Sequence, residues 1–211
     1  NAINVDYIKR FNECWIPDHP ELRLSGSLSG NKIISAAKYI GLLSRFSKHK
    51  KAGDEKFDVL LLLSGVEPQR TILEEKLINY FQNTNHSVAL VRGTKEQMTT
   101  LPSHITPFGL LCSEELKELI GQSNTVICRS GYSSIMDLVM LQKKMFLVPT
   151  PGQPEQEYLA EYLHQKYGIP YMEQQAIAKQ VFALDSSKAI ELPFGIKNEN
   201  LLEGAIAKLP K

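Results

Sequence analysis

The stretch Thr125-Val-Ile-Cys-Arg-Ser-Gly-Tyr-Ser-Ser-Ile-Met-Asp-Leu-Val-Met-Leu-Gln142 has the pattern of one strand–loop–helix unit. Its first four residues are mostly β-branched, and they predict a buried strand over Thr125–Cys128. The apolar residues that follow recur at helical spacing, and they predict a helix over Ser133–Gln142. A turn of serines around Gly131 connects the two.

The same alternation extends over most of the chain from Phe57 onward. The predicted strands are 57–63, 87–91, 108–112, 125–128 and 145–148, with a further short one at 169–172. The predicted helices are 71–81, one from the N-cap Ser113 to about Gln122, 133–142, 154–167 and 200–208. Strands that alternate with helices of this length predict an α/β fold, a doubly wound parallel sheet.

Length and composition exclude several classes of protein. The 211 residues are 43% hydrophobic, enough for a substantial core. Lys plus Arg (24) nearly balance Asp plus Glu (23), and this excludes the basic field that drives nucleic-acid binding. The longest purely apolar run, Val59–Leu63, is far shorter than the roughly 20 residues of a membrane helix. Three scattered cysteines fit a reducing compartment, so we expect a cytoplasmic protein without a nucleic-acid partner.

Ligands of doubly wound sheets bind at the carboxyl ends of the strands, so chemistry is expected in the strand-to-helix loops. In the loop Cys128–Ser134, Gly131 lets the backbone approach a ligand closely. The amides at the start of the following helix form an anion site, and the serine hydroxyls add donors. The loop predicts a phosphate or diphosphate site, although a simple helix-capping turn explains the same residues equally well.

Two further groups of polar residues suit a nucleotide or a sugar. Asp137, on the helix after Gly131, has the position of a carboxylate that binds ribose hydroxyls, or it only interacts with the helix dipole. Gln153, Gln156 and Glu157 follow the strand 145–148, and amides and carboxylates suit a hydroxyl-rich ligand. Their alternative role is that of ordinary exposed residues at a helix start.

The loop Ser64–Arg70 has one glycine and matches neither the dinucleotide-binding pattern nor a P-loop. This argues against a dinucleotide-dependent oxidoreductase and against a P-loop NTPase. Gly65 is a candidate contact to a sugar or phosphate. Glu67 and Arg70 alternatively pair with each other at the start of the helix.

Two segments together resemble the carboxyl-terminal donor-binding domain of GT-B glycosyltransferases. They are Val126-Ile-Cys-Arg-Ser-Gly-Tyr-Ser-Ser-Ile-Met-Asp137 and Val148-Pro-Thr-Pro-Gly-Gln-Pro-Glu-Gln-Glu-Tyr-Leu-Ala160. The chain is similar to the N-acetylglucosaminyltransferase family that forms lipid II in peptidoglycan synthesis, with the carboxyl-terminal domain of glycosyltransferase family 28. The resemblance covers about residues 14–168 and implies a Rossmann-like domain that binds a nucleotide-sugar without a metal ion.

The residues assigned to the donor nucleotide-sugar are Arg45, Gly65, Leu111, Cys112, Ser130, Gly131, Tyr132, Ser133, Asp137, Gln153, Gln156 and Glu157. The resemblance implies that Ser130–Ser133 lie at the diphosphate and that Asp137 binds the ribose. It implies that Gln153 faces the diphosphate or sugar, while Gln156 and Glu157 lie near the sugar. It also places the nucleobase at the backbone of Leu111 and Cys112, and makes Arg45, in Gly41-Leu-Leu-Ser-Arg45, a phosphate clamp.

The sequence departs from the family at three of these places. Asp137 stands where the family has a glutamate, and Glu157 stands where it has a second glutamine. Ser64-Gly65-Val66 replaces its Gly-Gly-Ser loop. The chain therefore resembles a divergent branch, for which a UDP-sugar is expected but the sugar is open.

The resemblance also divides the chain. Phe11–Asp18 resembles the last strand of the family's other domain, so residues 1–44 are expected to be the end of an amino-terminal domain and the interdomain crossover. Residues 45–211 are expected to form the donor domain. An irregular start without Met fits a piece of a larger two-domain enzyme. The acceptor site, the catalytic base and any peripheral membrane contact would lie on the missing half, so no catalytic residue is assigned and the piece alone is expected to be inactive.

The expected function is the donor-binding half of an inverting glycosyltransferase that transfers a hexose or N-acetylhexosamine from a UDP-sugar to an unknown acceptor. A nucleotide-sugar 2-epimerase of the same architecture is one alternative, and conversion of a UDP-sugar without an acceptor would favour it. A non-catalytic nucleotide-sugar-binding module is the other, and tight UDP binding without turnover would favour that.

Overall fold

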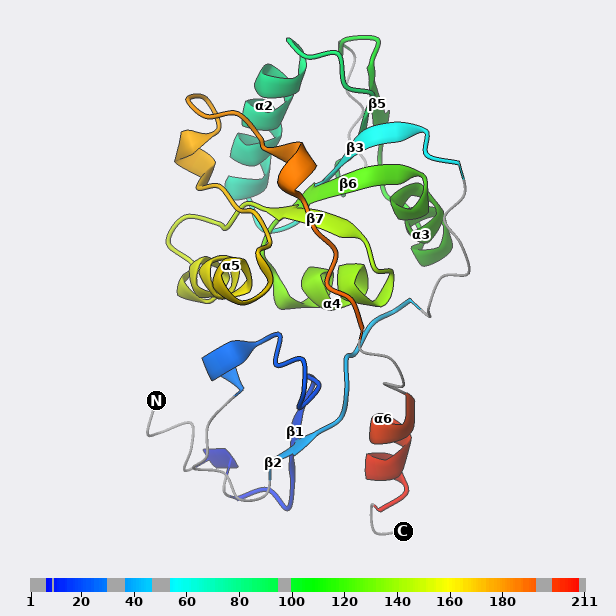
Figure 1. Ribbon diagram of the computed structural model, residues 1–211, viewed down its shortest axis with the longest axis vertical. Helices are drawn as coiled ribbons and strands as arrows, with labels where there is room; N and C mark the ends of the chain where they lie inside the picture. Colours follow the sequence, from blue (N-terminus) through cyan, green and yellow to red (C-terminus); the bar gives the residue numbers. More distant parts are fainter. Residues whose placement is uncertain are drawn as a thin grey trace. The chain divides into compact units, whose positions relative to one another are not determined.

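The computed structural model describes residues 7–8, 10–29, 37–46, 54–94, 100–192 and 199–208. The chain divides into two compact units (Figure 1), residues 45–191 and residues 1–44 together with 192–211. The first of these holds every residue assigned to the donor nucleotide-sugar. Among the described helices, none has the length and apolar character needed to cross a membrane.

The larger unit is built on a five-stranded sheet in the order β5-β4-β3-β6-β7, in which every neighbouring pair is parallel. The strands are β3 (Phe57–Leu62), β4 (Val88–Val91), β5 (Ile105–Phe108), β6 (Ser123–Cys128) and β7 (Lys144–Leu147). The helices are α2 (Gln69–Phe81), α3 (Ser113–Gly121), α4 (Tyr132–Met140) and α5 (Pro154–Tyr167), followed by the short turns η2 (Gln174–Ala176) and η3 (Leu184–Ser186). The predicted doubly wound α/β fold is confirmed.

The strand order fixes where a ligand crevice can form. From β3 the chain runs outward through β4 to β5, then returns to place β6 on the other side of β3. The direction of winding therefore reverses between β3 and β6. Loops that leave the two central strands diverge at such a reversal, and the crevice between them is the usual ligand site of doubly wound sheets.

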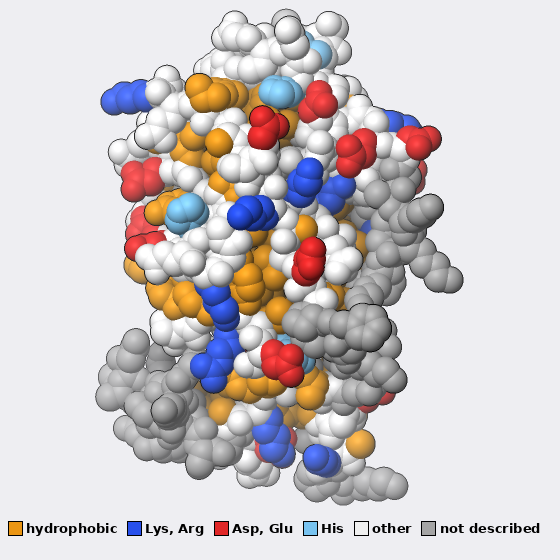
Figure 2. Space-filling model, in the orientation of Figure 1, with side chains coloured by type: hydrophobic (Ala, Val, Ile, Leu, Met, Phe, Trp, Pro, Cys, Tyr) orange, Lys and Arg blue, Asp and Glu red, His pale blue; other side chains and the backbone are white. Residues whose placement is uncertain are grey.

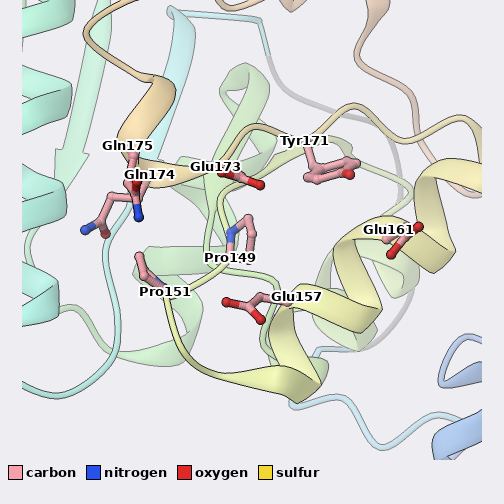
Figure 3. A pocket seen from close by; sticks show the side chains of 8 residues that line it. All are labelled: Pro149, Pro151, Glu157, Glu161, Tyr171, Glu173, Gln174 and Gln175. Carbon is pink, nitrogen blue, oxygen red and sulfur yellow. The ribbon is translucent and has the colours of Figure 1, made fainter.

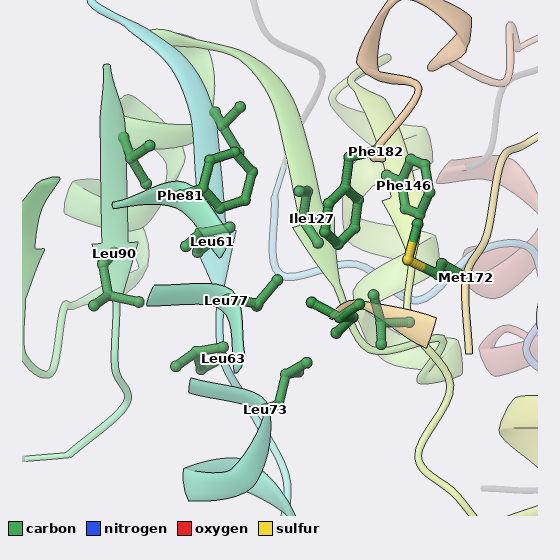
Figure 4. Packing of buried hydrophobic residues seen from close by; sticks show 14 of the residues in the cluster. Leu61, Leu63, Leu73, Leu77, Phe81, Leu90, Ile127, Phe146, Met172 and Phe182 are labelled. Carbon is green, nitrogen blue, oxygen red and sulfur yellow. The ribbon is translucent and has the colours of Figure 1, made fainter. Parts of the chain in front are cut away.

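Both faces of the sheet are covered, because successive residues of a strand point to opposite sides. Leu61 and Leu63 pack with Leu77 and Phe81 of α2 in one buried cluster (Figure 4), which also includes Phe182. Helices α3 and α4 lie on the other side of the sheet (Figure 1). Burial on both faces explains why β3 is a continuous apolar run from Val59 onward.

The predicted strand over 108–112 is wrong. The third strand in sequence is β5, Ile105–Phe108, and it pairs only with β4 at the edge of the sheet. An edge strand tolerates Pro107, which lacks the N–H needed for a second neighbour. The apolar residues after Phe108 belong to a loop, where Leu110 is 58% exposed.

Two smaller predictions also need correction. The N-cap of α3 is Cys112 rather than Ser113, because the carboxylate of Glu115 accepts a hydrogen bond from the Cys112 amide at 2.8 Å. The segment 169–172 forms no full strand and pairs with β7 only between Leu147 and Tyr171.

Helix α5 has the bounds that the sequence predicts. Pro154 occupies its first turn, where a missing N–H is harmless, and Gly168 ends it in the left-handed conformation at φ 68°. The Gly168 amide donates to the carbonyl of His164 at 2.8 Å. A side chain at this position would be strained, and a Cβ would lie 3.1 Å from Nζ of Lys188.

We expect Gly168→Ala to lower the free energy of unfolding by about 1 kcal/mol, because alanine pays the left-handed penalty that glycine avoids. Urea denaturation of the two proteins measures the difference. Gly204→Ala is the control, since a Cβ at Gly204 of α6 meets no atom within 4 Å. An unchanged midpoint for Gly168→Ala would contradict this account of the helix end.

The smaller unit holds a parallel strand pair, β1 (Cys14–Ile16) with β2 (Ala37–Tyr39), the turn η1 (Gly26–Leu28) and helix α6 (Glu199–Ile206). The buried carboxylate of Asp18 accepts hydrogen bonds from the amides of Leu24 (3.0 Å) and Ser25 (2.9 Å). These bonds fix the turn after β1. That residues 1–44 come from a second domain stays a prediction.

Candidate functional site

The connection from β6 to α4 is only three residues long, Arg129-Ser130-Gly131. Gly131 is the N-cap of α4 and brings no side chain to its first amides. A Cβ at Gly131 would meet no atom within 4 Å. The backbone at Gly131 thus has open space beside it, at the reversal of the sheet, and the amides at the start of a helix favour an anion.

The two serines predicted at the diphosphate differ in their surroundings. Ser130 is fully buried, and its hydroxyl donates to the backbone carbonyl of Gln156 at 2.7 Å. It thus ties the β6–α4 loop to the first turn of α5. Ser133 is exposed on the first turn of α4, and Tyr132 beside it is half-buried.

Arg129 holds three parts of the larger unit together, a role that no pattern in the sequence indicates. Its side chain is 2% exposed and donates to the carbonyls of Pro149 (3.1 Å) and Gln69 (2.8 Å) and to the side-chain oxygen of Gln174 (2.5 Å). A weaker bond reaches the carbonyl of Val148 at 3.4 Å. These acceptors belong to the start of α2, the loop after β7 and η2.

The acceptors of Arg129 are all neutral. Burial lowers the pKa of Arg129 to about 10, so the guanidinium still carries its charge at pH 7. Arg129 is the first residue of the three-residue loop that leads into α4. A buried cation bonded to neutral acceptors leaves a positive potential around it, and the amides at the start of α4 also favour an anion.

Arg45 and Asp137, which are predicted to bind the phosphate and the ribose, contact each other. The Arg45 Nε lies 2.9 Å from the Asp137 carboxylate, and the Arg45 backbone amide lies 3.3 Å from it. Asp137 is 8% exposed, whereas about half of the Arg45 side chain is exposed. The two predicted ligand groups are thus adjacent, on residues 92 positions apart.

The loop between β7 and α5 is fixed by the polar residues that are predicted to lie near the diphosphate or the sugar. The Gln156 side-chain oxygen accepts from the Thr150 amide at 3.0 Å, and its amide group donates to the Gln153 side chain at 2.6 Å. Glu157 accepts from the Gly152 amide at 2.8 Å. These bonds hold the loop against the first turn of α5.

A pocket of about 290 Å³ opens beside this loop (Figure 3). The residues that line it are Pro149, Pro151, Glu157, Glu161, Tyr171, Glu173, Gln174 and Gln175. Its walls thus come from the β7–α5 loop, from α5, from the segment before η2 and from η2 itself. Glu157 is the residue that the pocket shares with the predicted donor site.

In the loop after β3, the predicted pairing of Glu67 with Arg70 is observed. Gly65 is exposed at φ +106°, and a Cβ there would meet nothing within 4 Å. Glu67 and Arg70 do pair, with 2.6 Å between Arg70 Nε and the carboxylate. Arg70 also bonds the buried Glu74 at 2.9 Å, and Glu74 pairs with Arg92 at the end of β4. These charges stabilise the start of α2, while Gly65 borders the crevice.

Leu111 and Cys112 follow β5 in a loop and do not end a strand. Both backbone groups of Cys112 serve α3, because its amide donates to Glu115 and its carbonyl accepts from Leu116 at 3.0 Å. Leu111 is half-buried just before it. Of the two, Leu111 is better placed to offer its backbone to a ligand.

The cysteines of the larger unit should differ strongly in reactivity. Cys128 is buried in β6, which raises the pKa of its thiol to about 12, whereas Cys112 is exposed. We expect iodoacetamide at pH 8 to modify Cys112 and to leave Cys128 unmodified in the folded protein, because the thiolate is the nucleophile. Mass spectrometry of the peptides measures this, with urea-unfolded protein as the control. Equal modification of both before unfolding would contradict the burial of β6.

The surface carries charges of both signs. On the face shown in Figure 2, acidic and basic side chains of the described residues are intermixed. Anion binding in the crevice would therefore depend on local groups such as Arg45, Arg129 and the α4 amides, consistent with the net charge of +1.

Comparison with known proteins gives the same architecture. The glycosyltransferase of kitacinnamycin is 14% identical, with a TM-score of 0.57 over 86% of this chain and 46% of that one. The calicheamicin glycosyltransferase CalG4 is 10% identical, with a TM-score of 0.54 over 83% of this chain and 48% of that one. MurG of Acinetobacter baumannii is 16% identical, with a TM-score of 0.47 over 59% of this chain and 38% of that one.

The chain thus spans less than half the length of these three solved glycosyltransferases. It shares the GT-B Rossmann-like fold of the kitacinnamycin and calicheamicin enzymes. No curated protein was found to match it. Residues 66–186, more than half of the chain, match the glycosyltransferase family 28 C-terminal domain. The chain therefore belongs to the glycosyltransferase family 28 C-terminal domain family.

Proposed function

We propose that this chain is the half of a glycosyltransferase that binds a UDP-linked hexose or N-acetylhexosamine. The observation that carries the proposal is the start of α4. It lies at the reversal of the sheet with open space at Gly131 and with the buried Arg129 charge beside it. Such a site suits the diphosphate of a nucleotide-sugar.

The Arg45–Asp137 pair suggests what happens when the nucleotide binds. Arg45 is half exposed, so it can leave the carboxylate and contact a phosphate. Asp137 would then accept hydrogen bonds from the ribose hydroxyls. In this proposal each of the two side chains leaves the other and contacts the ligand instead. Without the ligand, the ion pair between Arg45 and Asp137 compensates both charges.

The chemistry proposed is an inverting transfer. An acceptor hydroxyl gives its proton to a base on the partner domain of the enzyme, and its oxygen bonds to the anomeric carbon. The bond from that carbon to the diphosphate oxygen breaks, and UDP leaves with the electron pair. The α4 amides, Arg45 and Arg129 would stabilise the charge on the leaving diphosphate, and the proposal requires no metal ion for this step.

Thermal unfolding with nucleotide-sugars tests the binding function. A ligand at about 100 times its Kd adds roughly 2.7 kcal/mol of stability, which raises the Tm of a chain of this size by about 5–10 °C. We expect UDP and at least one UDP-sugar to give such a shift. GDP, dTDP and CDP and their glucose or mannose derivatives establish the preference for the base, and uridine serves as the control without phosphates.

The outcomes separate the parts of the proposal. A shift with UDP but none with uridine supports a diphosphate site. A shift with a different nucleoside diphosphate, and none with UDP, would overturn the assignment of UDP as the donor nucleotide. It would retain the proposed donor site. No shift with any member of the panel would overturn the donor-binding function.

A further inference from the structure

Gln174 of η2 lies next to the buried charge of Arg129. We infer that Gln174 is a positioning residue for the donor: as a neutral acceptor it holds the Arg129 side chain and leaves the guanidinium charge uncompensated, so that it attracts the diphosphate. A carboxylate in the same place would hold the side chain equally well and would cancel the charge. This inference rests on the proposed function and deepens it by naming a residue that controls the affinity for the anionic part of the donor.

The amide group of Gln174 is oriented by two hydrogen bonds. Its side-chain oxygen accepts from the Arg129 guanidinium at 2.5 Å, and its NH2 group donates to the side-chain oxygen of Gln69 at 3.0 Å. Gln174 is 5% exposed, so little water reaches this amide. The side chain thus presents its oxygen, the negative end of the amide dipole, to the cation.

The neutral partner of Arg129 is unusual for a buried cation. A carboxylate is the common partner of a buried arginine, because it compensates a charge that has lost its water. Arg129 is 2% exposed, yet none of the described carboxylates forms an ion pair with it. The residue before Gln174 is a glutamate, but Glu173 is exposed and lines the pocket of Figure 3. The fold thus places an amide on the cation and leaves the adjacent carboxylate in solvent.

The guanidinium of Arg129 lies at the carboxyl edge of the sheet. Arg129 follows β6, and its acceptors Gln69 and Pro149 belong to the segments that follow β3 and β7, the two strands on either side of β6. The charge is therefore among the loops that border the proposed crevice. A charge inside a protein acts over a longer range than one in water, because the medium around it screens less. It can attract a diphosphate at the start of α4 without contacting it.

Gln174→Glu tests the inference, because it adds a negative charge with almost no change in shape. We expect the new carboxylate to pair with Arg129 and the Gln69 amide to turn its NH2 group toward it, so that the Tm stays equal to that of the unmodified protein or rises. We expect the Kd for UDP, measured by calorimetry, to rise about tenfold or more, because the paired guanidinium no longer attracts the diphosphate. The rise should be smaller for UMP, which carries less charge.

Gln174→Met makes the opposite change. Methionine has a similar volume and leaves the Arg129 charge in place, but it removes both hydrogen bonds of the amide. We expect the Tm to fall by about 3–6 °C. The Kd for UDP should stay within about threefold of that of the unmodified protein, at a temperature where both are folded. Gln180→Glu is the matched control, because it adds the same charge to an exposed residue of the same segment that does not bond Arg129, and it should leave the Kd for UDP unchanged.

The order of the two variants distinguishes control of the charge from a purely structural role. A structural role predicts weaker UDP binding by the less stable Gln174→Met, whereas the inference predicts weaker binding by Gln174→Glu. If Gln174→Met does not fold, the comparison of Gln174→Glu with Gln180→Glu decides.

The possible results also separate this inference from the function on which it rests. An unchanged Kd for UDP in Gln174→Glu, or a Tm well below that of the unmodified protein, would overturn the inference and leave the proposed UDP site in place. Failure of the unmodified protein to bind any nucleoside diphosphate would overturn the proposed donor function and the inference with it.

Discussion

Replacement of Gly131 by valine is expected to abolish UDP binding and to leave the protein folded. The N-cap backbone of Gly131, at φ −73° and ψ 134°, is one that valine adopts without strain, and a Cβ there meets no atom within 4 Å. The branched side chain would instead occupy the space in front of the α4 amides. We expect a loss of affinity of at least 100-fold, because a diphosphate needs close approach to those amides.

Calorimetry with UDP measures this loss, and urea denaturation checks that the free energy of unfolding changes by less than about 1 kcal/mol. Gly131→Ala should bind with intermediate affinity, since one methyl group blocks less space. Gly204→Val is the control for a new valine in open space outside the larger unit, and it should bind UDP normally. Normal UDP binding by Gly131→Val would move the diphosphate away from α4.

The fold could be predicted because its signals are local. Each parallel strand is buried on both faces and appears as a short apolar run, and α5 is bounded by Pro154 and Gly168. The error at β5 has a physical cause. An edge strand that contains Pro107 has a weak pattern, and the apolar loop residues after it, such as Leu110, imitate a buried strand.

The gathering of the strand-to-helix loops at one edge of the sheet could also be predicted, since parallel strands bring their carboxyl ends together. The partners of the side chains could not. Ser130 bonds a residue 26 positions away, Arg129 bonds Gln69 60 positions away, and Arg45 bonds Asp137 92 positions away. Such bonds depend on how the loops meet in space, and no periodicity in the sequence encodes them.

Arg129→Met is expected to have the largest effect on stability of the changes considered. Methionine fills similar space but leaves the Pro149 and Gln69 carbonyls and the Gln174 side chain without their buried donor. Each acceptor left unsatisfied costs about 1 kcal/mol or more, so we expect the free energy of unfolding to fall by about 3 kcal/mol. Urea denaturation measures this change.

A second buried cation provides the matched control. Lys143 is 9% exposed, and its Nζ donates to the Gly121 carbonyl at 3.4 Å. Burial lowers the pKa of Lys143, as it lowers that of Arg129. Lys143→Met removes a charge but only one long hydrogen bond, so its effect should stay below about 1 kcal/mol.

Arg129→Lys separates the charge from the hydrogen bonds. A lysine keeps the positive charge beside α4 but lacks the planar fork that reaches acceptors in three segments. We expect Arg129→Lys to lower the free energy of unfolding about as much as Arg129→Met does. We also expect Arg129→Lys to retain more affinity for UDP than Arg129→Met. Both affinities are measured at a temperature where the two variants are folded. Equal affinity of the two variants would show that Arg129 acts only by positioning the loops. If Arg129→Met were about as stable as the unmodified protein, the loops would hold their arrangement without the Arg129 side chain. The burial of Arg129 and of its acceptors argues against that outcome.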